Sequence, residues 1–279
     1  MILATAADQP AIEAFLRQHI TTAMFSMANL RRHGMNGGHP RALTIWLRKE
    51  GDVITDALAI SEEGMIFPHC PTGPWEAAQA VLKGHALIGL LGDAGQVDAL
   101  RHALGMTAAA GHVTTEPLYR LALNDLIMPD VTGFTLRPLS DAPRDLVLGW
   151  RRAYLRETMH MQGDAVDTTA IKEIDSYSAA DSHRVLYQGD QPVAMTGFNA
   201  TLPDAVQIGG VYTPPDQRAR GLARRAVALH LAQARTAGVS EAVLFAATVH
   251  AAKAYEAIGF ARIGSFGIAI FENPQVVHG

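Results

Sequence analysis

Hydrophobic and polar positions in the second half of the chain follow two periods, one near 3.6 and one of two residues. Together they predict one strand, two helices, three strands, a helix, a strand, a helix and a final strand. These elements are expected, in that order, at 134–139, 143–160, 168–179, 183–188, 192–200, 206–213, 220–237, 242–247, 251–258 and 262–270.

The first half repeats this outline more faintly. Helical patterns lie within 11–33, and strands are expected at 42–48, 54–61 and 65–70. A helix at 74–83, a strand at 86–91, a helix at 95–104 and a last strand at 118–123 follow. Pro and Gly within 124–133, beside a new strand signal, indicate a join between two halves. We therefore predict an α/β (α+β) protein with two domains, 1–130 and 131–279.

One segment of the second half, 211–223, combines chemistry that the rest of the chain lacks. A strand end, a Pro-rich turn and a helix start rich in Arg and Gly follow one another there. Such a junction directs several backbone N–H groups and positive charge at one point, which suits a pyrophosphate. Gly221 matters because a Cβ at that position would keep an anion away from the backbone.

The spacing Arg-x-x-Gly-x-Ala, at Arg218, Gly221 and Ala223, resembles the acyl-CoA-binding motif of the GNAT acyltransferases, the Gcn5-related N-acetyltransferase superfamily. The order of elements over 132–272 is also the GNAT order. The resemblance implies tandem GNAT-like mixed, mostly antiparallel sheets flanked by helices, with acetyl-CoA or another acyl-CoA as co-substrate. It assigns pantetheine contacts to the backbone of Val211, Tyr212 and Thr213. The amides of Ala219, Arg220, Gly221, Leu222, Ala223 and Arg224 would surround the pyrophosphate. Arg218, Arg220, Arg224 and Arg225 would supply charge, and one or more of them would meet the ribose phosphate of CoA.

A second resemblance covers 248–260. Many GNATs have Asn where this chain has Thr248, and a Tyr at the position of Tyr255. By resemblance, Tyr255 would protonate the departing thiolate, and a core tyrosine that anchors its helix is the alternative. Thr248 would supply a weaker pantetheine contact than Asn.

The group that deprotonates the acceptor amine is not apparent. Many GNATs carry a Glu on or near the strand equivalent to 206–211, where this chain has no carboxylate. Substitutes in the helical region that would cover the acceptor are Glu157, His160, Asp164, Asp167 and Glu173. Glu157 is the first choice as a catalytic residue. A solvated helix carboxylate and a water chain ending on backbone carbonyls remain alternatives.

The first half lacks the motif between its third strand and the next helix. Pro71-Thr72-Gly73-Pro74 occupies that place, and proline removes donor N–H groups. Phe15-Leu16, Asn29-Leu30-Arg31 and Gly34 resemble the N-terminal domain of a two-domain branch of predicted bacterial GNATs. We expect 1–130 to be a degenerate GNAT-like domain that has lost the phosphate cradle, and 131–279 to be the domain that binds acyl-CoA.

The composition of the chain limits the kinds of partner that we expect it to bind. The 279 residues are 48% hydrophobic and 18% charged with a net charge of −4, which predicts a packed core and gives no support for nucleic-acid binding. Cys70 is the single cysteine, so no internal disulfide forms, and the twelve histidines show no zinc-binding spacing. Without a secretion signal or a membrane-length apolar run, we expect a cytoplasmic protein that binds no metal and no membrane.

The favoured function is transfer of an acetyl or short acyl group from CoA to an amine by direct attack on the thioester. A non-catalytic acyl-CoA-binding regulatory module is the alternative, motivated by the missing strand carboxylate and by Thr248. A structural protein that uses its first half as a binding face is a third possibility. The acceptor, the acyl group and the choice between monomer and homodimer stay open.

Overall fold

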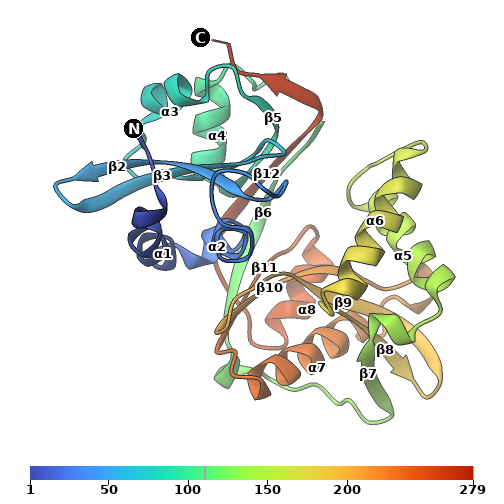
Figure 1. Cartoon of the computed structure of the whole chain (residues 1–279). Helices are drawn as coiled ribbons and strands as arrows, with labels where there is room; N and C mark the ends of the chain where they lie inside the picture. The colour runs from blue at the N-terminus through green and yellow to red at the C-terminus, as the bar shows by residue number, and fades with distance from the viewer. Residues whose placement is uncertain (110, 279) are drawn as a thin grey trace. The chain divides into compact units, whose positions relative to one another are not determined.

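The computed structural model describes every residue except 110 and 279. The chain divides into two compact units, one made of Met1–Glu116 with Ser265–Gly279 and one made of Pro117–Gly264. Each unit is described by itself (Figure 1).

The first unit is a mixed sheet with helices on both faces. Its strands are ordered β1-β2-β3-β4-β5-β12, and only β4 and β5 run parallel to each other. Helices α3 and α4 lie on one face and α1 and α2 on the other (Figure 1). The elements are β1 (Ile2–Leu3), η1 (Ala6–Asp8), α1 (Gln9–Gln18), α2 (Ile20–His33), β2 (Leu43–Glu50), β3 (Val53–Ser61), β4 (Met65–His69), α3 (Trp75–Leu82), β5 (Ala86–Asp93), α4 (Ala94–Ala103) and most of β12 (Ala261–Val276).

The second unit has the same plan. Its strands are ordered β6-β11-β10-β9-β8-β7, and only β10 and β11 are parallel. The elements are β6 (Gly111–Ala122), η2 (Leu123–Asp125), β7 (Phe134–Pro138), η3 (Leu139–Asp141), α5 (Arg144–Glu157), α6 (Ala165–Ala179), β8 (His183–Gln188), β9 (Gln191–Thr201), β10 (Ala205–Tyr212), η4 (Pro215–Gln217), α7 (Leu222–Thr236), β11 (Glu241–Phe245) and α8 (Val249–Glu256).

Two hydrophobic layers hold the second unit together. On one face, Trp150 of α5 and Ile174 of α6 share a buried cluster with Met195 and Tyr212 of the sheet. On the other face, α7 and α8 pack against β10, β11 and the end of β6. Helix α7 follows the apolar spacing expected for a helix with one buried stripe.

Each unit completes its sheet with a strand from the other half of the sequence. Residues 118–122 of β6 pair with 241–245 of β11 in the second unit. Residues 266–276 of β12 pair with 86–93 of β5 in the first. The compact units are therefore interleaved along the sequence, whereas the assignment of separate roles to 1–130 and 131–279 stays a prediction.

The predicted fold class and order of elements are confirmed, with differences at the ends. Helix α7 begins at Leu222 and not at residue 220, because Ala219 and Gly221 have φ of +61° and +70°, outside the right-handed helical region. Strand β6 begins at Gly111 and β12 continues to Val276, both longer than their sequence patterns indicated.

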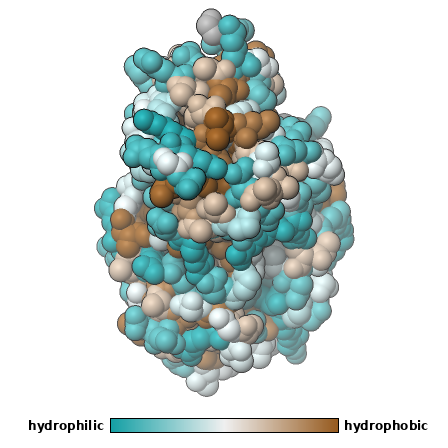
Figure 2. Space-filling model, turned by 60° about the vertical axis from the view of Figure 1, so that its left-hand side comes forward, coloured by the Kyte–Doolittle hydropathy of each residue, from teal (hydrophilic) through white to brown (hydrophobic). Residues whose placement is uncertain are grey.

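On the face shown in Figure 2, brown hydrophobic patches are separated by hydrophilic side chains. Across the described residues, no helix combines the length and the apolar composition needed to cross a bilayer.

Candidate functional site

The site is framed by the parallel strands β10 and β11. Their pairing spans Ala205–Gln207 and Glu241–Val243 and stops there, although β10 continues to Tyr212 and β11 to Phe245. The backbone groups of 208–212 that face β11 are thus left for another partner. An extended chain of amide groups, such as pantetheine, can add to such an edge as a strand would.

A bulge directs this edge of β10. The register with β9 shifts between Gly209 and Tyr212, and Gly210 has φ of +63°. Glycine adopts this conformation without the steric penalty that a Cβ would bring. The bulge turns the backbone of Gly210 and Val211 out of the regular ladder, so the sequence Gly-Gly in a buried strand marks the site.

The loop between β10 and α7, called the anion cradle below, has backbone donors that suit a bound anion. Among the described residues, no protein group accepts a hydrogen bond from the backbone amides of 219–224, and the first turn of α7 lies within this run. Residues Ala219 and Gly221 in the left-handed region break the helical course, so that successive N–H groups line a concave turn. Free amides at a helix N-terminus favour a bound phosphate.

The arginines of this loop divide by their contacts. Arg225 donates to the carbonyl oxygens of Asp130 and Arg220, and Arg220 donates to Gln188 at 3.2 Å and to Gln217. The Nε atom of Arg224 is buried and has no hydrogen-bond partner in the described part of the chain. An unpaired buried donor is unfavourable by about 1–3 kcal/mol, so a ligand oxygen at Arg224 would be stabilising.

The predicted residues of 248–260 lie on the far side of the strand gap. Thr248 is the N-cap of α8, and its Oγ1 accepts a hydrogen bond from the Ala251 amide at 3.1 Å. Its oxygen is therefore already used in part, while its hydroxyl proton remains available. Tyr255 is buried in the cluster that contains Ile208 of β10 and Leu244 of β11, and its ring contacts Phe260 edge-on.

The candidate bases from the α5–α6 region differ in their contacts and positions. Glu157 accepts a hydrogen bond from Arg218 at 2.5 Å. Glu173 pairs with the buried Arg151 at 2.6 Å, and Asp167 pairs with Arg152. Asp164 precedes α6 and His160 is exposed with a positive φ of 54°. Glu157 is thus hydrogen-bonded to a residue of the motif.

Sequence reasoning missed His183. Its imidazole is fully buried, stacks on Tyr177 at 3.6 Å, and fills the space that a Cβ at Gly197 or Gly210 would occupy. Burial, and then the charge of Arg151, hold the pKa of His183 well below its usual value, so the ring is neutral. The pair of glycines at 209 and 210 was the available signal for a large side chain packed against this strand.

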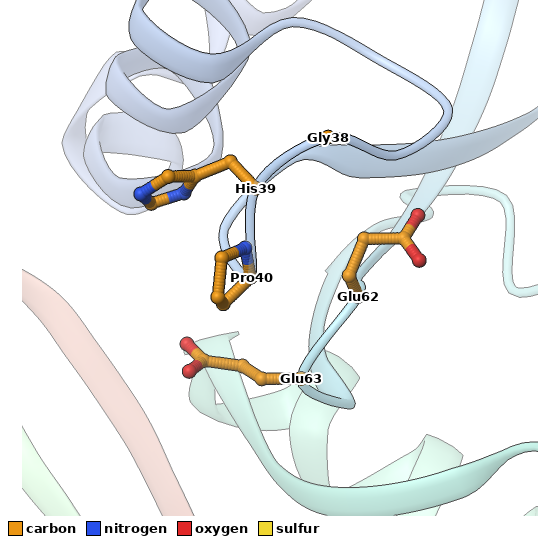
Figure 3. A pocket seen from close by; sticks show the side chains of 5 residues that line it. All are labelled: Gly38, His39, Pro40, Glu62 and Glu63. Atoms are coloured by element: carbon orange, nitrogen blue, oxygen red, sulfur yellow. The ribbon is translucent and has the colours of Figure 1, made fainter.

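A separate cavity of about 450 Å³ lies in the first unit. It is lined by Gly38, His39, Pro40, Glu62 and Glu63. The carboxylates of Glu62 and Glu63 point in different directions (Figure 3). No cluster of His, Cys, Asp or Glu that could hold a metal occurs among the residues that the structure describes. This open hollow therefore offers no convergent chemistry.

Comparison with known proteins identifies the class. Residues 148–260 match the profile of the Acetyltransferase (GNAT) family, while a comparison with curated proteins finds no match. This segment contains the bulge, the motif and Tyr255. Residues 148–260 therefore match the GNAT acetyltransferase family, as the motifs of this segment predicted.

Solved structures extend the likeness to the whole chain. A Drosophila protein has a TM-score of 0.62 at 12% identity, over 98% of this chain and 99% of its own. A tandem GNAT protein from the clavulanic acid biosynthesis pathway has a TM-score of 0.55 at 14% identity, over 96% and 97%. A GCN5-related N-acetyltransferase from Kribbella flavida has a TM-score of 0.53 at 17% identity, over 91% and 95%. At such identities the likeness shows the fold, which is that of the tandem GNAT proteins.

Proposed function

We propose that this protein transfers an acetyl or another short acyl group from CoA to an amine acceptor. The observation that carries the proposal is the run of unpartnered amides at 219–224 beside the open edge of β10. One feature suits the pyrophosphate of CoA and the other suits its pantetheine arm. The backbone of Val211, Tyr212 and Thr213 would bind the arm, and Arg220, Arg224 and Arg225 would add charge near the phosphates.

The reaction follows from this placement. The amine nitrogen attacks the thioester carbon and loses a proton to Glu157, directly or through water. The carbon–sulfur bond then breaks, and the thiolate takes a proton from the hydroxyl of Tyr255. Tyr255 suits this role because its helix packs against both strands that border the gap.

Calorimetric titration with acetyl-CoA tests the donor site. We expect one acetyl-CoA per chain with a Kd of roughly 1–100 µM, in the range of common substrate affinities. A panel of alkyl, aryl and poly-amines, amino acids and peptides, followed by mass spectrometry, tests transfer. Acylated product that falls at least about tenfold in Tyr255→Phe supports the acid role. Absence of acetyl-CoA binding would refute the proposal.

A further inference from the structure

Two residues selected from the sequence for opposite halves of the reaction are bonded to each other. Arg218, the first residue of the motif, donates from Nη2 to Glu157 Oε2 at 2.5 Å. Its Nε donates to the carbonyl oxygen of Thr213 at 3.0 Å, and its guanidinium carbon lies 5.8 Å from the centre of the Tyr212 ring. These three contacts hold the guanidinium beside α5 and the end of β10.

The contact with Arg218 stabilises the negative charge of Glu157 and fixes its position. Glu157 is the last residue of α5, where the helix dipole is unfavourable for a negative charge. The arginine offsets that effect and fixes one carboxylate oxygen. The other oxygen, Oε1, accepts no hydrogen bond from the described residues, and the side chain is 42% exposed. A carboxylate held by one oxygen and open at the other is set to accept a proton from an amine or from water.

The anion cradle does not need Arg218. Arg224 lies in the first turn of α7 with a buried, unpartnered Nε, while the groups that Arg218 contacts, on Thr213, Glu157 and Tyr212, lie outside 219–224. We propose that Arg218 is a positioning residue that orients Glu157 toward the acceptor, and that Arg224 is the side chain that binds the pyrophosphate. This inference rests on the proposed acyl transfer and specifies which residue prepares its base.

Two matched variants of one loop, Arg218→Gln and Arg224→Gln, test whether the two arginines have these separate roles. In titrations with acetyl-CoA, Arg224→Gln should raise Kd about tenfold, as loss of a charge-assisted hydrogen bond would, whereas Arg218→Gln should change it less than about twofold. With the most active amine of the panel, Arg218→Gln should lower kcat at least about tenfold at little change in the KM for acetyl-CoA. Arg218→Lys, which keeps the charge, should recover part of kcat.

A double-mutant cycle adds a second measure. Glu157→Gln and Arg218→Gln should together lower kcat no further than Glu157→Gln alone, because Arg218 acts only through Glu157. A rise in the acetyl-CoA Kd of Arg218→Gln as large as that of Arg224→Gln would overturn the inference. Tighter acetyl-CoA binding by Glu157→Gln would also overturn it, since Arg218 would then be a phosphate ligand withheld by Glu157. If the unchanged protein binds no acetyl-CoA, the proposed function itself fails, which is a different result.

Discussion

The loop after β4 in the first unit and the loop after β10 in the second occupy equivalent places in the two strand orders, and they use their backbone donors in opposite ways. In the first, Cys70 donates its amide to the side chain of Gln96 and Thr72 donates to the carboxylate of Asp56. The amides of Gly73 and Trp75 bond to carbonyl oxygens of the loop, and Pro71 and Pro74 have no N–H. In the second, six consecutive amides are unpartnered within the described chain.

Asp56 explains how the first loop is stable without a ligand. Its side chain is fully buried, and Oδ1 and Oδ2 accept hydrogen bonds from the amide and hydroxyl of Thr72 at 2.9 and 2.7 Å. A protein carboxylate thus serves the loop in place of an external anion. A shared fold therefore allows a phosphate cradle, and the hydrogen bonds of the loop decide whether one exists.

The largest expected effect is a loss of acetyl-CoA binding when one glycine in the loop after β10 is replaced. The same substitution in the loop after β4 serves as the control. Gly221→Glu places a carboxylate in the cradle at φ of +70° and should weaken acetyl-CoA binding at least about a hundredfold in titration, because like charge and strain act together. Gly73→Glu is the matched control, since Gly73 has φ of +69° in the equivalent loop. It should leave the Kd within about twofold. Equal losses in both variants would mean that the first loop also binds acetyl-CoA.

Acid should weaken both units through buried histidines. Burial lowers the pKa of His69 in the first unit and of His230 in the second to about 3, and the pKa of His183 falls as well. In the unfolded chain these rings bind protons below about pH 6.5, so stability is lost as pH falls from there toward the folded pKa. Each of His69 and His230 should lower the free energy of unfolding by about 2 kcal/mol between pH 7 and pH 5.

Denaturant titrations at the two pH values measure this effect. With two such rings, the second unit should lose more stability than the first, and tryptophan fluorescence can separate them in variants that keep Trp150 alone or Trp46 alone. A stability that is flat between pH 7 and pH 5 would contradict the neutral, buried state of these rings.

The smallest expected effect concerns the Asp56 carboxylate, which accepts the hydrogen bonds of Thr72 in the first loop. Asp56→Ala leaves the Thr72 amide without its acceptor and should lower the free energy of unfolding by about 1–3 kcal/mol in urea. Acetyl-CoA affinity should stay within about twofold and the stoichiometry at one per chain, because Pro71 and Pro74 still supply no donors. A second bound acetyl-CoA in Asp56→Ala would show that the carboxylate alone blocks the first loop.

The sequence predicted the features that depend on local pattern. Apolar periodicity located nearly every helix and strand. The glycine and arginines of 218–225 pointed to a phosphate site, which stays a prediction. The sequence could not reveal the partners of β6 and β12, because an apolar strand pattern carries no record of its neighbour. The pairing of Glu157 with Arg218 and the burial of Asp56 against Thr72 were also hidden, since each joins residues far apart in the chain.

The strand that each unit takes from the other half of the sequence determines when that unit can complete its sheet during synthesis. Residue 270 of β12 pairs with residue 89 of β5, so the first unit cannot close its sheet until β12 has left the ribosome. The second unit needs only 117–264 and can be complete earlier. During synthesis, the edge of β5 therefore has to wait for β12, although residues 1–116 precede the second unit in the chain.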